Sequence, residues 1–236
     1  MAVLHHTAVF HNSLDPSIDP AHPELSTEGK VVFITGGGSG LGPRLIHSLA
    51  KSGATNIVII GRTEATLESA KKTVEAQYSG VSVLALTTDI SDQKEVNAAF
   101  TSTKNGFGPV DILVSNVETY QISCLSPQLL STSSLKGFDV NFKGDLILAQ
   151  AFLANVVDGP ILINVDTISA HAWASHPAME VSKVAAVKMW EYIAAGNPHG
   201  RTVTVHLGVI DTAMNKECND AGMIFPLDSE FPLYLI

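Results

Sequence analysis

Short apolar runs alternate with segments of helical periodicity along most of this chain. A short run rich in Val and Ile is typical of a strand that is buried on both faces. Apolar residues spaced three and four positions apart are typical of an amphipathic helix. The runs predict strands at residues 30–35, 56–60, 81–86, 110–115, 161–165 and 203–207.

The segments between these strands carry the helical spacing. Further helices are predicted around residues 95–100 and over residues 178–195. Alternation of this kind predicts an α/β fold, a Rossmann-type doubly wound parallel sheet with helices on both faces. Right-handed crossovers bring the carboxyl ends of the strands to one edge, so we expect the loops there to build the site. The helical spacing between the strands is carried by three sets of apolar residues: Leu41, Leu45 and Leu49; Leu67, Ala70 and Val74; and Leu135, Phe138, Phe142, Leu146 and Leu153.

The alternating pattern predicts one domain over residues 29–236, a length that can bury a substantial core. Residues 1–28 lack periodicity and contain Pro16, Pro20 and Pro23, which predicts an extended N-terminal arm. The apolar end at residues 232–236 has no clear seventh strand before it. Either a piece is missing at this end, or these residues are buried against a partner subunit.

A glycine-rich turn follows the first predicted strand, in the sequence Thr-Gly-Gly-Gly-Ser-Gly-Leu-Gly at residues 35–42. Glycine allows the backbone to turn tightly and to approach a pyrophosphate, while the N–H groups at the start of the next helix meet the negative charge. A strand before the turn and a helix after it are the context that this motif requires. The turn residues that we expect to bind a dinucleotide are Gly36, Gly38, Ser39, Gly40, Leu41 and Gly42.

Composition and charge narrow the classes of binding partner and of location that we expect for this chain. The formal net charge of −9 argues against a nucleic acid or an anionic membrane surface. No apolar run reaches the roughly 18 to 20 residues of a membrane span, and the N-terminus lacks the pattern of a secretory signal. Cys124 and Cys218 form neither a disulfide framework nor a metal-ligand spacing, and no cysteine or carboxylate cluster supports the arm histidines as ligands. We therefore expect a cytoplasmic protein with no metal site and reduced thiols.

From about Lys30 to Met214 the chain resembles the short-chain dehydrogenase/reductase family. The glycine turn is similar to the family's T-G-x-x-x-G-x-G motif, residues 111–117 are similar to the strand that runs into N-N-A-G, and residues 207–212 are similar to P-G-x-x-x-T. The resemblance implies an oxidoreductase with a nicotinamide cofactor and a small-molecule substrate. It also implies a homodimer or homotetramer that packs through the helices at residues 135–156 and 178–195.

The same resemblance implies roles for single residues. Asp89 and Ile90 follow the third strand, where the family holds the adenine, and Asn116 lies in the segment similar to N-N-A-G. Val209 would lie at the nicotinamide and Thr212 at its phosphate. Asn141 falls on the helix asparagine of the catalytic tetrad, although it could instead only brace its helix.

The choice between NAD and NADP can be argued from the end of the second strand. Enzymes that use NAD usually place a carboxylate there, which binds both ribose hydroxyls and would repel a 2′-phosphate. Here Arg62 follows the strand, with Ser39 and Thr63 near it, and these groups suit the phosphate of NADP(H). The alternative is that Arg62 is a solvated surface charge and that Glu64 binds the ribose.

The expected catalytic residues depart from the family pattern. The family uses a tyrosine four residues before a lysine, and the lysine lowers the tyrosine pKa so that the hydroxyl can exchange a proton with the substrate. Here Lys183 is retained for the ribose, but Met179 stands at the tyrosine position. Counting back from Met179 puts Asp166 at the position of the family's serine, whereas matching the strand motif favours Thr167.

These substitutions favour the reduction of an iminium ion, a cationic C=N group, over the reduction of a ketone to an alcohol. An alkoxide formed from a ketone would be repelled by Asp166, and nothing at residue 179 would protonate it. An iminium ion is already positive, and a carboxylate stabilises it until hydride transfer neutralises it. The pattern resembles fungal reductases of the malbrancheamide and paraherquamide type, which are also intramolecular Diels–Alderases, and this implies a cationic or indole-containing substrate in alkaloid biosynthesis. The pocket residues that we expect are Glu118, Trp173, His176 and Met179.

Two other functions fit the sequence. The chain could be a non-catalytic protein that binds NADP(H) through the glycine turn at residues 35–42, the cofactor cradle, and has lost catalytic activity. It could also be a ketoreductase whose proton comes from Glu118, from His176 or from water.

Overall fold

The computed structural model describes residues 16–119, 135–166, 177–207, 210 and 212–220. These residues contain one six-stranded sheet with the order β3-β2-β1-β4-β5-β6, in which all neighbouring strands are parallel. The chain therefore starts in the middle of the sheet, moves outward to β3, and returns across β1 to continue toward β6. The strands are β1 (Val31–Thr35), β2 (Asn56–Gly61), β3 (Ser82–Thr87), β4 (Val110–Ser115), β5 (Val156–Asp166) and β6 (Arg201–His206).

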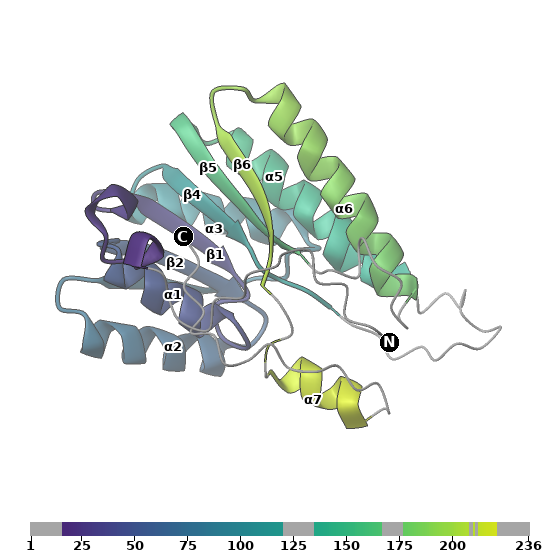
Figure 1. The fold of residues 1–236 in the computed structure, drawn as a ribbon, viewed down its shortest axis with the longest axis horizontal. Helices are drawn as coiled ribbons and strands as arrows, with labels where there is room; N and C mark the ends of the chain where they lie inside the picture. The colour runs from purple at the N-terminus through teal and green to yellow at the C-terminus, as the bar shows by residue number, and fades with distance from the viewer. Residues whose placement is uncertain (1–15, 120–134, 167–176, 208–209, 211, 221–236) are drawn as a thin grey trace.

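Helices cover both faces of the sheet. Figure 1 shows α1 and α2 on one face and α3, α5 and α6 on the other, which confirms the predicted doubly wound parallel sheet in a single domain. Within the described ranges, no helix has both the length and the apolar character that a membrane crossing requires. The helices are α1 (Gly42–Lys51), α2 (Glu64–Gln77), α3 (Gln93–Gly106), α4 (Leu135–Phe138), α5 (Asp145–Leu153), α6 (Pro177–Gly196) and α7 (Ala213–Asp220).

The core lies in two apolar layers, one on each side of β1. All five residues of β1 are buried, because a central parallel strand is covered by helices on both faces. Toward α3, the rings of Phe33 and Phe100 stack with centroids 4.5 Å apart. Toward α1 and α2, Ile34 packs in a layer with Leu45 and Leu67. This double burial explains why the strands appear in the sequence as continuous apolar runs.

The long helix predicted over residues 135–153 is interrupted. A π-helical segment, η5 (Asp139–Gly144), joins α4 to α5. A π turn contains an extra residue and is common at functional sites. Gly144 closes the segment, and a Cβ atom there would lie 2.8 Å from the side chain of Ile90. The close approach of this helix to the loop after β3 therefore requires glycine.

Strand β5 is longer than predicted. It spans Val156–Asp166 rather than residues 161–165, and its pairing with β4 shifts register between Val110 and Ile112. Gly159 has a φ of 68°, and Pro160 follows it. Glycine and proline inside a strand mark such irregularities, and they hide the first half of the strand in the sequence.

The described part of the N-terminal segment differs from the extended arm that we predicted for residues 1–28. Residues 16–28 contain two short 3-10 helices, η1 (Pro16–Ile18) and η2 (Pro23–Leu25). The segment is attached to the end of α1, because Asp19 forms an ion pair with Lys51 at 2.8 Å and the Thr27 amide donates to the carbonyl of Ser52 at 2.9 Å.

Candidate functional site

The glycine turn between β1 and α1 is held against the end of β2. The amides of Gly36 and Gly37 both donate to the carbonyl of Ile60, at 2.8 and 3.2 Å. Gly36 and Gly40 have φ angles of 69° and 57°, a backbone region that favours glycine. Glycine therefore occupies these two positions of the turn, where the backbone has a positive φ angle.

Three other glycines in the turn are required by close packing. A Cβ atom on Gly37 would lie 2.6 Å from the Cβ of Ile59, and one on Gly38 would lie 2.5 Å from the hydroxyl of Thr66. A Cβ atom on Gly42 would overlap the backbone of Gly36 and Gly37. The turn is therefore packed tightly against β2, α2 and its own first residues.

The start of α1 is suited to binding an anion. Leu41 is the N-cap residue and makes no side-chain capping hydrogen bond. In the first turn the amide of Gly42 donates to the carbonyl of Ser39 and that of Arg44 to the carbonyl of Leu41, both at 3.0 Å, so an anion here would be held by the helix dipole and by the amides of the preceding turn. Ser39 and Gly40 are exposed beside this helix end. Such a helix end, with its partial positive charge, can hold a phosphate group.

Two other predicted cofactor residues lie against the turn. The amide group of Asn116, at the end of β4, would be 3.0 Å from a Cβ on Gly36, and it donates to the carbonyl of Thr35 at 3.0 Å. The methyl group of Thr212, just before α7, would be 4.0 Å from a Cβ on Gly40. The structure thus brings together residues from β1, β4 and the start of α7.

The residues proposed for the adenine end follow β2 and β3. Arg62 and Thr63 are exposed after β2. Hydrogen bonds from the hydroxyl and amide of Ser91, with a smaller contribution from the charge of Arg62, lower the pKa of the Asp89 carboxyl. Arg62 and Asp89 therefore lie near each other. The side chain of Ile90 is buried in the core, so this residue does not offer its side chain to a ligand in solution.

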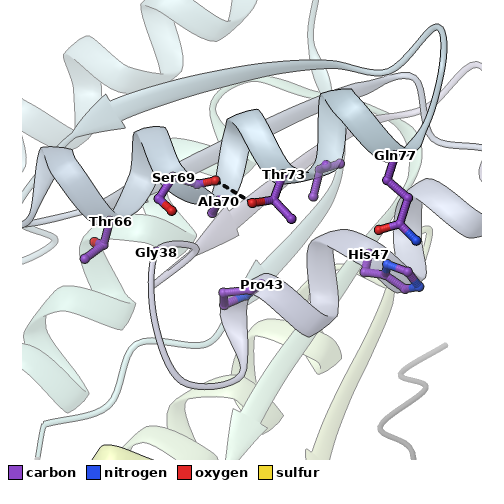
Figure 2. Close-up of a pocket in the computed structure, with 9 residues that line it drawn as sticks. Gly38, Pro43, His47, Thr66, Ser69, Ala70, Thr73 and Gln77 are labelled. Atoms are coloured by element: carbon purple, nitrogen blue, oxygen red, sulfur yellow. Dashed lines mark hydrogen bonds between the residues drawn. The ribbon is translucent and has the colours of Figure 1, made fainter.

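A separate groove of about 260 Å³ lies behind the turn, between α1 and α2. Figure 2 shows that Pro43 and His47 of α1 face Thr66, Thr73 and Gln77 of α2 across it. Gly38 lies at one end of the groove. The groove is thus lined by one residue of the glycine turn and otherwise by α1 and α2.

The predicted catalytic side is built from the end of β5 and from α6. Asp166 is the last residue of β5 and is only 6% exposed. The Lys183 side chain is 1% exposed, and its Nζ donates to the carbonyl of Val165 at 3.3 Å. Lys183 therefore reaches from α6 to the strand residue that precedes Asp166. Met179 lies in the first turn of α6, whereas Thr167, Trp173, His176 and Val209 lie outside the described residues.

Asn141 braces three segments in the structure. Its Oδ1 accepts from the amide of Thr119 at 2.9 Å. Its Nδ2 donates to the carbonyl of Thr119 at 3.0 Å and to the hydroxyl of Ser182 at 3.1 Å. The π segment is thereby fixed to the loop after β4 and to α6. In that loop, Glu118 has a buried Oε1 without a hydrogen-bond partner among the described residues.

One buried carboxyl group was not predicted from the sequence, that of Asp145 at the start of α5. The hydroxyl of Ser115 donates to its Oδ1 at 2.6 Å, and the indole N–H of Trp190 donates to its Oδ2 at 3.2 Å. Burial raises the pKa of this carboxyl, and the charge of Lys183 opposes the rise. Nearby, the buried amide of Asn164 has no partner among the described residues. Asp145 begins α5, whose other residues are apolar except for Gln150, and this single carboxyl group before an apolar run was the available signal.

Comparisons with known proteins agree with the fold. A family model described as short chain dehydrogenase matches residues 30–222. The short chain dehydrogenase pigC of Monascus ruber is 31% identical over 213 residues, which are 86% of this chain and 69% of pigC. The short chain dehydrogenase tazN of Aspergillus terreus is 32% identical over 192 residues, which are 78% of this chain and 41% of tazN.

Solved structures are also similar to the chain. A dehydrogenase/reductase from Sinorhizobium meliloti has a TM-score of 0.75 at 25% identity, covering 84% of this chain and 78% of its own. A short chain dehydrogenase from Burkholderia cenocepacia, solved in complex with NADP, has a TM-score of 0.75 at 24% identity, covering 87% and 86%. The second comparison supports the fold alone.

We expect Gly42→Ala to abolish the cradle, because the added methyl group would overlap the backbone of Gly36 and Gly37. The melting temperature should fall, and fluorescence titration should show no saturable NADPH binding. Gly106→Ala at the end of α3 is the matched control, because nothing lies within 4 Å of its added Cβ. That variant should gain up to about 1 kcal/mol of stability, since alanine favours helix. Unchanged melting and binding in Gly42→Ala would contradict the packing described.

Asp145→Asn should change how stability depends on pH. The pKa of Asp145 in the fold is raised above the ordinary value of 3.8, so the folded state holds this proton more tightly than the unfolded state does. The wild type therefore loses stability as pH rises from the unfolded pKa through the folded pKa. Asparagine lacks this penalty and can keep both hydrogen bonds, since its oxygen accepts from Trp190 and its amide donates to Ser115.

The measurement is urea unfolding of both proteins between about pH 4 and about pH 8. Relative to the wild type, Asp145→Asn should become progressively more stable with rising pH. A constant stability difference across this range would show that the Asp145 carboxyl is not perturbed by its burial.

Proposed function

Because the chain belongs to the short-chain dehydrogenase family, whose members use NAD(P)(H), we propose that it is an NADP(H)-dependent reductase of a cationic C=N group. The observation that carries this proposal is the carboxylate of Asp166, buried at the end of β5 beside the strand residue that Lys183 contacts. By resemblance to the family, Met179, which lies in the first turn of α6, is expected at the position of the proton-donating tyrosine.

The binding side fits a dinucleotide. The glycine turn and the uncapped start of α1 would hold the pyrophosphate, with Asn116 and Thr212 beside it. Arg62, Ser39 and Thr63 are exposed at the edge where β1 and β2 end together, so they can surround a 2′-phosphate. Lys183 would hold the ribose next to the nicotinamide. When bound, NADPH supplies the hydride that converts the C=N group to an amine.

Asp166 provides what this reaction needs from the protein. An iminium substrate is positive before reduction and neutral afterwards, so the transfer requires no proton in the same step. A carboxylate in a poorly solvated site stabilises such a cation strongly, because little water screens the interaction. The buried Oε1 of Glu118, in the loop after β4, would add negative charge on the same edge. Intramolecular [4+2] cyclisation after the reduction stays a prediction from resemblance.

Replacing Asp166 with asparagine tests the reaction. Purified protein would be incubated with NADPH and a panel of cyclic imines, and hydride uptake would be followed by mass spectrometry. Asp166→Asn should lower imine turnover by about 100-fold or more, as for the loss of one charge-stabilising group in an active site. Its affinity for NADPH should stay within about threefold, because the carboxylate is not part of the cradle.

The matched control is Asp158→Asn, an exposed carboxylate in the first half of the same strand. It should leave imine turnover unchanged. Equal turnover in Asp166→Asn and the wild type would refute the iminium proposal. Ketone reduction that does not depend on Asp166 would support a ketoreductase, and NADPH binding without any turnover would support a non-catalytic binding protein.

Arg62→Ala tests the cofactor. Removing a charged hydrogen bond to the 2′-phosphate should raise the dissociation constant of NADPH by about 10-fold to 100-fold, while that of NADH changes by less than about threefold. Arg201→Ala, an exposed arginine at the start of β6 and so at the opposite edge, is the control and should change neither. Tighter binding of NADH than NADPH by the wild type would mean that Glu64 binds the ribose instead.

A further inference from the structure

Asn164, in the second half of β5, has a buried side chain that is not paired. It is 1% exposed, and both its Oδ1 and its Nδ2 lack a hydrogen-bond partner among the described residues. An amide group buried in this way costs free energy, because it has given up its hydrogen bonds to water. Nearly all buried polar groups in folded proteins are paired, either with protein atoms or with an ordered water molecule. The position therefore calls for a partner.

The strand register shows where this amide lies. Asn164 is paired with Ser115 of β4 on one side and with Thr204 of β6 on the other. Leu162 and Leu113, each two positions earlier in these strands, belong to the apolar layer on the face that α3, α5 and α6 cover (Figure 1). Side chains two positions apart in a strand leave the same face, so Asn164 and Ser115 also point into this layer. Because neighbouring strands are about 4.8 Å apart, the two side chains lie next to each other.

Two groups beside the amide can still accept hydrogen bonds. The hydroxyl of Ser115 donates its proton to Oδ1 of Asp145 at 2.6 Å, which leaves the lone pairs of the serine oxygen for a further donor. Each oxygen of the Asp145 carboxylate can accept more than the one hydrogen bond that it receives from Ser115 or Trp190. Asn164 bonds to neither group directly. A bridging molecule would therefore find partners on both sides.

The unpaired atoms determine the class of this molecule. Oδ1 of an asparagine accepts a hydrogen bond, and Nδ2 donates. A cation would satisfy only the oxygen, and an anion would satisfy only the nitrogen. Water both donates and accepts, and it is small enough for a close-packed interior. Thr204 in the adjacent strand is exposed, so bulk solvent is only one strand away from the amide.

We propose that Asn164 holds buried water, which links the amide in β5 to the Ser115–Asp145 pair of β4 and α5. Water at this site accepts from Nδ2, donates to Oδ1 and donates to an oxygen of the pair. Strand β5 thereby gains a side-chain link to β4 and α5 two residues before the strand ends. The inference concerns the chain without cofactor or substrate, so it does not rest on the proposed function.

Counting buried water in the purified full chain tests the proposal. Nuclear magnetic relaxation dispersion of the water oxygen counts the molecules that stay inside a protein longer than the protein takes to tumble. A chain of 236 residues contains on the order of nine buried waters, so the count must be compared between variants. Asn164→Leu has a side chain of similar size without polar atoms. Its count should be lower than that of the wild type by at least one molecule.

Two further variants serve as controls. Asn155 lies just before β5, and its Nδ2 already donates to the carbonyl of Ala151 at 2.9 Å. Asn155→Leu should therefore leave the count of buried water unchanged. Asn164→Ser is the conservative replacement, because its hydroxyl can both donate and accept. This variant should keep at least the wild-type count.

An unchanged count in Asn164→Leu would overturn the proposal, because the wild-type amide would then be dry and unpaired. In that case the unfolding equilibrium constant of Asn164→Leu should be lower than that of the wild type by about tenfold or more, since the cost of an unpaired amide is removed. If Asn164→Leu does not fold, a high-resolution crystal structure of the wild type decides. Ordered water within about 3.2 Å of Oδ1 or Nδ2 would support the proposal, and a site without ordered water would overturn it.

Discussion

The parallel pairing of β1 with β2 on one side and β4 on the other organises this molecule. Because the strands run the same way, Thr35, Ile60 and Val114 arrive together near one edge, and the loops that follow them share that edge. The glycine turn exists to cross this crowded edge. It must pass close to Ile59 and Thr66 and still place the start of α1 at the surface. Side chains there would push α1 away from the sheet.

The two halves of this edge follow different physical rules. The half near β1, β2 and β4 is a backbone site, in which glycine packing and an uncapped helix end determine what fits. The half near β5 and α6 is a site of buried charge, where Asp166 and Lys183 are almost inaccessible to water. A backbone site keeps its ligand class as long as the glycines remain. A charged site changes its preferred substrate when one residue changes, so the proposed reduction of a C=N group rests on two single residues, Met179 and Asp166.

The sequence predicted those features that depend on local patterns. Burial of β1 on both faces produces an apolar run, and the helix faces that cover it repeat with helical spacing. It could not predict the π segment at Asp139–Gly144, because the partners that hold its Asn141 by hydrogen bonds, Thr119 and Ser182, are distant in the sequence. The first half of β5 was missed for a local reason, since Gly159 and Pro160 are typical of loops. Asp145 was missed because its partners, Ser115 and Trp190, are 30 and 45 residues away.

The contacts of Asp145 show what burying a carboxyl group requires in this fold. Its two oxygens accept from a hydroxyl and an indole N–H that come from different elements, β4 and α6. Those hydrogen bonds offset part of the cost of burying the group. Burial nevertheless raises the pKa of this carboxyl, although the charge of Lys183 opposes the rise. The residue therefore joins α5, β4 and α6, and a less acidic carboxyl group is the consequence.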